Sequence, residues 1–174
     1  LASAGDIDGD GIEELALGTP TANAGGAVTL IFLNADGSIR ETKTIQGGNG
    51  FGSSIAAIGD LNNDGVSDIA VGATRADGQA GAVYVQFMNA DGTVASSTTI
   101  GDNVGGGPDL AGRISRMGAS LTNMGDLNGD GVNDLAVGAH YYGLTNAASR
   151  SGAVFVLMMN PDGTAQSTTR LSRD

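Results

Sequence analysis

One sequence unit occurs three times in this chain, and this repetition limits the folds that are open to it. The copies start at Leu1, Ile55 and Leu121 and align without a gap through the acidic segment that follows each start. A second block, Gly-Ala-Val followed by apolar residues, begins at positions 26, 81 and 152 and runs into an Asp-Gly turn. Units of this kind bury apolar surface by stacking on their neighbours, so the repetition predicts an array of small, similar modules.

Each unit is expected to contain four short β-strands. A first strand ends at a Gly-Asp pair, and apolar segments such as 68–73 and 81–87 form the second and third strands. An Asp-Gly hairpin turn leads into a polar, Thr-rich fourth strand, which ends at Ile45, Ile100 or Leu171. The apolar second and third strands are expected to be covered on both faces, and the polar fourth strand is expected at an outer edge.

Four strands in about fifty residues, repeated along the chain, are typical of β-propeller blades, so the predicted fold class is all-β. The predicted blades are residues 1–45, with a truncated first strand, 51–100 and 117–171. Residues 46–50 and 101–116 are expected to link the blades. The 30 glycines fit a turn-rich β architecture, and no window of useful length shows helical periodicity.

An acidic loop with the pattern Asp-x-Asp/Asn-x-Asp-Gly-x-x-Asp/Glu lies between the first two strands of every unit. Side-chain oxygens at positions 1, 3 and 5 of a tight loop can converge on one point, and the glycine at position 6 permits the turn. A backbone carbonyl at position 7 and the acid at position 9 would complete an oxygen cage suited to a hard cation. We therefore predict three Ca²⁺ sites, one per repeat, formed by Asp6, Asp8, Asp10, Ile12 and Glu14, by Asp60, Asn62, Asp64, Val66 and Asp68, and by Asp126, Asn128, Asp130, Val132 and Asp134.

Two other interpretations of these loops are weaker. An EF-hand needs an acid at position 12 between two helices, but position 12 is Leu17, Val71 or Val137, each inside an apolar strand. Merely solvated Asp-Gly turns would not explain why the loop recurs at matching places in three repeats. Without a cation, the close carboxylates would also repel one another. Oxygen-only ligation disfavours zinc and copper.

Charge and composition exclude several functions. The net charge of −11 disfavours nucleic acid and anionic lipid as partners, and no segment has the roughly 20 apolar residues that a membrane span requires. Cysteine is absent, which excludes disulfides and zinc–thiolate sites. His140 is the only histidine and no nucleophile-elbow motif accompanies it, so we predict no catalytic residues and no enzyme activity.

These motifs resemble the FG-GAP repeats of integrin α-subunit propellers and their bacterial relatives. Phe51-Gly52 matches the Phe-Gly of the name, while the third unit has Met117-Gly118 there. Residues 71–73 and 137–139, Val-Gly-Ala in both cases, stand where Gly-Ala-Pro is expected. The resemblance implies Ca²⁺ in the hairpin loop between the first two strands of a blade. It also implies a ring of about seven blades, so three blades are expected to be part of a larger or multi-chain assembly.

The chain is therefore interpreted as a calcium-binding extracellular module with a structural or adhesive role in a secreted or cell-surface protein. Extracellular calcium modules work with Kd values of about 10⁻⁴–10⁻³ M, a range that cytosolic calcium cannot serve. The expected partners are a protein or glycan ligand, or other copies in a multi-chain propeller, array or filament. The alternative is a non-catalytic propeller domain attached to an exported enzyme such as a hydrolase.

Overall fold

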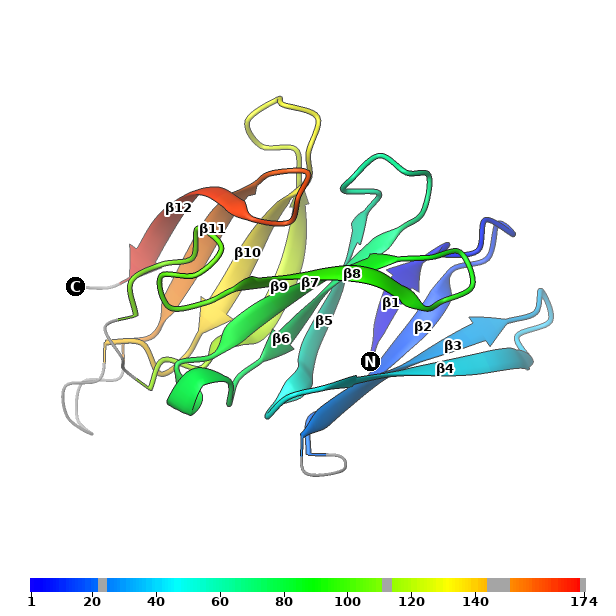
Figure 1. The fold of residues 1–174 in the computed structure, drawn as a ribbon, viewed down its shortest axis with the longest axis horizontal. Coiled ribbons are helices and arrows are strands. Elements are labelled where there is room, and N and C mark those ends of the chain that lie inside the picture. Colours follow the sequence, from blue (N-terminus) through cyan, green and yellow to red (C-terminus); the bar gives the residue numbers. More distant parts are fainter. Residues whose placement is uncertain (22–24, 111–113, 144–150, 173–174) are drawn as a thin grey trace.

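The chain folds into three four-stranded antiparallel sheets that are arranged as successive blades (Figure 1). A computed structural model describes residues 1–21, 25–110, 114–143 and 151–172. Within each sheet, every strand pairs with the strand that precedes or follows it in the sequence, so each blade is a simple meander. The prediction of an all-β fold made of three four-stranded blades is confirmed.

The strands have the following bounds. Blade 1 consists of β1 (Ala2–Gly5), β2 (Glu14–Thr19), β3 (Gly26–Leu33) and β4 (Ile39–Gly47). Blade 2 consists of β5 (Phe51–Gly59), β6 (Asp68–Ala73), β7 (Ala82–Met88) and β8 (Val94–Ile100). Blade 3 consists of β9 (Met117–Gly125), β10 (Asp134–Ala139), β11 (Ala153–Met159) and β12 (Ala165–Ser172).

Two outer strands are longer than the sequence predicted. β4 continues through Gly47, so the first two residues of the predicted 46–50 linker belong to the strand. β12 continues to Ser172, one residue beyond the predicted end of the third blade. In the described part of the chain, no helix has the length and apolar character needed to cross a membrane.

Each inner strand of blade 2 has one face toward blade 1 and one toward blade 3, because side chains alternate along a strand. On β6, Ile69, Val71 and Ala73 contribute to the core shared with blade 1, whereas Ala70 contributes to the core shared with blade 3. On β7, Val83, Val85 and Phe87 face blade 3. The continuous apolar sequence of these strands therefore follows from burial on both sides.

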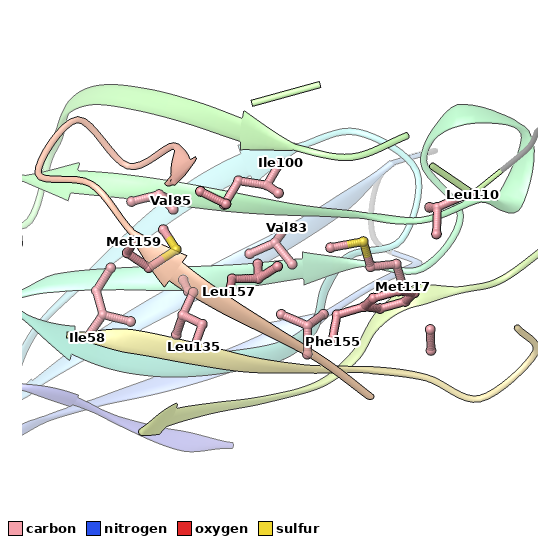
Figure 2. Packing of buried hydrophobic residues seen from close by; sticks show 14 of the residues in the cluster. Ile58, Val83, Val85, Ile100, Leu110, Met117, Leu135, Phe155, Leu157 and Met159 are labelled. Carbon is pink, nitrogen blue, oxygen red and sulfur yellow. The ribbon is translucent and has the colours of Figure 1, made fainter. Parts of the chain in front are cut away.

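The two cores of the molecule are consequently the joints between blades. Figure 2 shows the second joint, where Phe155 and Leu157 of β11 and Leu135 of β10 meet Val83 and Val85 of β7. All five side chains are at most 1% exposed. Each joint removes apolar surface of both blades from water, which is the main stabilising contribution that a repeat array has.

Coverage of both faces is complete only in the middle blade. Every residue of β6 is buried. The prediction of two covered faces is wrong for β2 and β10, which alternate between buried and accessible residues because their blades have a neighbour on one side only. Leu17, on the outer side of β2, is 41% exposed.

Backbone meets backbone at both joints. A Cβ atom built on Gly72 of β6 would lie 2.0 Å from the carbonyl oxygen of Gly118 in the next blade. At the first joint, the same construction on Gly18 falls 2.0 Å from the carbonyl oxygen of Gly52. Gly118 itself has φ +83°, a conformation that side chains rarely adopt. The backbones of Phe51-Gly52 and Met117-Gly118 thus pack directly against the glycine of the second strand in the preceding blade, which is Gly18 or Gly72.

Candidate metal sites

The three acidic loops are hairpins that join the first and second strands of their blades, at the same end of each sheet. In every loop, the first aspartate accepts hydrogen bonds from backbone N–H groups further along the turn. Asp60 accepts from Asp64 at 2.9 Å and from Gly65 at 2.7 Å. Asp126 accepts from Gly131 at 2.8 Å, and this bond contributes most to lowering the pKa of its carboxyl group. These bonds fold the loop around the carboxyl group of its first aspartate.

Positions 3 and 5 form successive side-chain turns with the backbone. The Asn62 side-chain oxygen accepts from the Asp64 N–H at 3.1 Å, and Asp64 accepts from the Val66 N–H at 2.9 Å. The Asn62 amide also donates to Asp64 at 2.8 Å, and the third loop repeats this contact between Asn128 and Asp130. These contacts hold the side chains at positions 3 and 5 against the backbone of the turn.

The acid at position 9 is buried and ties its loop to the third strand. The two carboxylate oxygens of Asp68 accept from the backbone N–H groups of Leu61 and Met88, both at 3.0 Å. Asp134 makes the equivalent bonds to Leu127 and Met159, both at 2.9 Å. Burial is the largest influence on Asp68 and raises its pKa to about 6. The loop motif does not show that its last acid bonds to the backbone of the third strand, so the sequence did not predict this contact.

Glu14 occupies position 9 of the first loop and differs from the two aspartates. One of its oxygens, Oε2, accepts from the Ile7 N–H at 2.7 Å. The other, Oε1, is buried and has no hydrogen-bond partner among the described residues. Burial raises the pKa of Glu14, and the neighbouring charges of Asp8, Asp6 and Asp10 raise it further. An orphaned buried carboxylate oxygen is costly unless a donor or a cation satisfies it.

The first loop brings three carboxylates together. Ligand oxygens of Asp6, Asp8 and Glu14 all lie within 4.8 Å of one another, a separation that one cation can bridge. The donor set is oxygen only, which fits Ca²⁺ and disfavours thiophilic metals. Oε1 of Glu14 is buried and has no hydrogen-bond partner among the described residues, so a cation bound here would satisfy it. For this reason the three residues fit a bound cation. The second and third loops carry Asn62 and Asn128 at position 3, and therefore one carboxylate fewer.

The residues predicted to offer a backbone carbonyl lie directly beyond these side chains. Val66 and Val132 are partly buried and pack against the two cores, and Ile12 is partly exposed. Their N–H groups donate to the acid at position 5, at 2.9 Å in all three loops. Anchoring of the valine side chains fixes the backbone at position 7 of the second and third loops.

Arg40 of β4 reaches into the first loop. Its guanidinium donates to Asp10 at 2.6 Å and also to Asp8. The matching positions in the other blades are Ala95 and Gln166, so this internal cation is specific to the first loop. Sequence reasoning missed it because Arg40 lies 30 residues from Asp10 and no motif marks it.

His140 is exposed, and its ring packs edge-on against Tyr141 with 4.7 Å between ring centroids. Tyr142 packs edge-on against the buried Phe155, so this tyrosine covers the end of the third blade.

Stacked four-stranded blades, each with an acidic hairpin loop between its first two strands, define a repeat protein of the β-propeller class. Comparison with known families identifies the kind of repeat. The FG-GAP-like repeat matches residues 6–71, and the FG-GAP repeat matches residues 117–157. The chain belongs to the FG-GAP repeat proteins and is of the integrin-α-like type.

Individual relatives agree with this assignment. The chain is 32% identical to integrin alpha-4 of Xenopus laevis over 146 residues, which are 78% of this chain and 14% of that protein. It is 40% identical to integrin alpha-3 of Cricetulus griseus over 134 residues, 73% of this chain and 12% of the relative. With integrin alpha pat-2 of Caenorhabditis briggsae, identity is 30% over 185 residues, 95% of this chain and 14% of the relative. The chain thus spans a small part of the length of the curated relatives it matches.

Proposed function

We propose that the three hairpin loops bind Ca²⁺ and that the chain is a non-catalytic, adhesion-type module of an extracellular protein. The observation that carries the metal assignment is the buried, unpartnered oxygen of Glu14 beside Asp6 and Asp8. The other two loops support it because they repeat two bonds of the first loop. The N–H of the glycine at position 6 donates to the aspartate at position 1, and the N–H at position 7 donates to the acid at position 5.

The proposed ligands are the side chains at positions 1, 3, 5 and 9 and the backbone carbonyl at position 7 of each loop. A bound cation would neutralise close carboxylates and hold the turn between the first two strands of a blade. Asp68 and Asp134 would link that turn to the third strand through their bonds to Met88 and Met159. Calcium would therefore stabilise the folded blade, to which it binds preferentially.

The adhesive role rests on the integrin α relatives. The relatives that this chain matches are integrin alpha subunits. We therefore propose that the partner of this chain is a protein. The proposed partners also include a glycan and other copies of the chain. The proposed extracellular location would supply the calcium that sites with Kd values of about 10⁻⁴–10⁻³ M need.

Calcium titration tests this proposal. We expect three ions per chain, with Kd values of about 10⁻⁴–10⁻³ M. At 1 mM calcium, each site should add about 0.4–1.4 kcal/mol of stability, and each kcal/mol corresponds to a rise in Tm of about 2–4 °C. Asp60→Ala is expected to lower the count from three ions to two. Absence of calcium binding would refute the metal assignment, and Kd values below about 10⁻⁶ M would contradict the extracellular tuning.

Arg40→Ala is expected to strengthen calcium binding at the first loop by about threefold or more, since the guanidinium competes for the oxygens of Asp8 and Asp10. The amide resonances of Gly11, Gly65 and Gly131 report on the three loops separately during a calcium titration. Only the Gly11 response should shift to lower calcium concentration. Arg40→Lys keeps the positive charge but lacks the two guanidinium nitrogens that donate to Asp8 and Asp10, so it should give an intermediate affinity. Equal shifts at all three glycines would contradict a local competition.

A further inference from the structure

A cleft lies between blades 2 and 3, at the end of the sheets that carries the acidic loops. Its volume is about 280 Å³. The lining comes from the second acidic loop, from β7 and β8, and from the β11–β12 turn of blade 3, and it includes Asn62, Phe87, Thr98 and Asp162. Ligand pockets usually have volumes of about 300–1,000 Å³, so this cleft has room for one side chain rather than for a large ligand.

Two cationic side chains fill the corresponding place at the first joint. Arg40 of β4 lies over the ring of Phe32, with 5.6 Å from its guanidinium carbon to the ring centroid, and it donates to the first acidic loop. Lys43 of the same strand pairs with Glu41 at 2.6 Å, and its charge also interacts with that of Asp91 in the β7–β8 turn of blade 2. The first joint thus holds cations close to an aromatic ring and to carboxylates of two successive blades.

The framework around the two places is the same. Phe32 and Phe87 occupy matching positions near the ends of β3 and β7. A Cβ atom built on Gly92, in the turn of blade 2, would lie 2.5 Å from the Phe32 ring. A Cβ atom built on Gly163, in the turn of blade 3, would lie 3.1 Å from the Phe87 ring. At both joints, therefore, the turn of the following blade packs against a phenylalanine of the preceding blade.

The second joint keeps this framework but lacks both cations. Ala95 holds the place of Arg40, and Thr98 holds the place of Lys43. Among the described residues, no cationic group lies over the ring of Phe87. The cleft is therefore the space that two shorter, uncharged side chains of β8 leave open.

Oxygen acceptors from both blades line this space. Asp162 of blade 3 accepts from the hydroxyl of Thr164 at 2.6 Å and from its N–H at 2.9 Å, and these bonds lower the pKa of the Asp162 carboxyl group. Asp162 forms no ion pair with any described residue. In blade 2, Asn62 holds the place of Asp8, which accepts from Arg40 at the first joint. A cation in the cleft would meet a free negative charge and an amide oxygen.

We propose that this cleft binds the arginine side chain of a protein partner, whose guanidinium would take at the second joint the place that Arg40 takes at the first. A planar guanidinium stacks on an aromatic ring and can donate to oxygens on more than one side at the same time. The net charge of −11 favours the approach of a cationic ligand. The inference rests on the proposed protein-binding role and not on calcium binding.

Titration with N-acetylargininamide in excess chelator tests this inference. We expect a saturable shift of the amide resonance of Gly163, which lies beside the Phe87 ring. The amide of Gly92 is the control in the same spectrum and should not respond, because Arg40 already fills the first joint. The neutral isostere N-acetylcitrullinamide should bind about tenfold more weakly. No saturable shift at Gly163, equal shifts at both glycines, or equal affinity for the two probes would overturn the proposal.

Ala95→Arg supplies the missing side chain from the chain itself. Ala95 is exposed, so the substitution should be tolerated, and the new arginine should abolish the response of Gly163 to N-acetylargininamide. Gln166→Arg is the matched control, because it adds the same charge at the same strand position of blade 3 and should leave the response unchanged. Asp162→Asn should weaken binding about three- to fivefold.

Two outcomes of these variants would contradict binding in the cleft. One is a Gly163 response that survives Ala95→Arg, and the other is a response that Gln166→Arg also abolishes. Because calcium is removed throughout, neither outcome would bear on the three calcium sites. Either would leave the proposed protein partner to another surface of the chain, so the two proposals fail separately.

Discussion

Gly72→Ala is expected to destabilise the chain by about 3 kcal/mol, the upper part of the usual range for overpacking. The new Cβ would lie 2.0 Å from the carbonyl oxygen of Gly118. Backbone atoms cannot rotate away from such a contact, so the second and third blades would have to separate along the core that they share. Chemical denaturation with excess chelator measures the loss without a contribution from calcium.

Gly138→Ala is the control for this effect, because it places the same methyl group at the same position of the next blade. Both glycines lie close to a serine hydroxyl of their own blade, Ser54 or Ser120, and only Gly72 also meets a neighbouring backbone. We expect Gly138→Ala to change stability by about 0.5 kcal/mol or less. Equal losses from the two substitutions would show that the joint does not depend on this close approach.

Asp68→Ala is expected to cost about 3 kcal/mol in calcium-free solution. The substitution leaves the buried N–H groups of Leu61 and Met88 without acceptors, and each unsatisfied donor costs about 1–3 kcal/mol. The loss is offset in part because a buried carboxylate with a raised pKa no longer has to be accommodated. Denaturation at neutral pH measures the net change, and faster hydrogen exchange at Met88 would locate it at the third strand.

Asn62→Ala in the same loop separates this effect from a general weakening of the turn. Asn62 is exposed, and among the described residues its side chain bonds only within the loop, to the N–H and carboxylate of Asp64. A loss below about 1 kcal/mol is expected, with no change of exchange at Met88. If the two variants lost equal stability, Asp68 would have no special role in linking the loop to β7.

The sequence predicted those features that depend on local pattern. Repetition and turn residues located the blades, and the apolar runs located strands such as β6 and β7. Fixed spacing located the acidic loops, because the first seven positions bond mainly to one another. Alternation along β6 could not assign one face to blade 1 and the other to blade 3, since both faces are apolar.

Contacts between distant segments escaped prediction for a physical reason. The bond from Asp68 to the Met88 N–H joins residues 20 apart, and a backbone donor leaves no mark in side-chain sequence. Arg40 approaches the first loop only because pairing of β3 with β4 brings it there, and its counterparts in the other repeats carry no charge. The seating of Phe51-Gly52 and Met117-Gly118 on glycines of the preceding blade likewise needs the packed structure.

The two faces of a blade are unlike, and this has a consequence for how such chains change in evolution. On the second strand, small residues such as Ala70 and Gly72 face forward, while larger ones such as Ile69 and Val71 face backward. A duplicated unit therefore carries both of the surfaces that form a joint, a forward face and a backward face. They match only when the two units have the same orientation along the array. Tandem duplication or loss of a whole unit can alter the number of blades without any compensating substitution, whereas inversion of a unit would place two unmatched surfaces against each other.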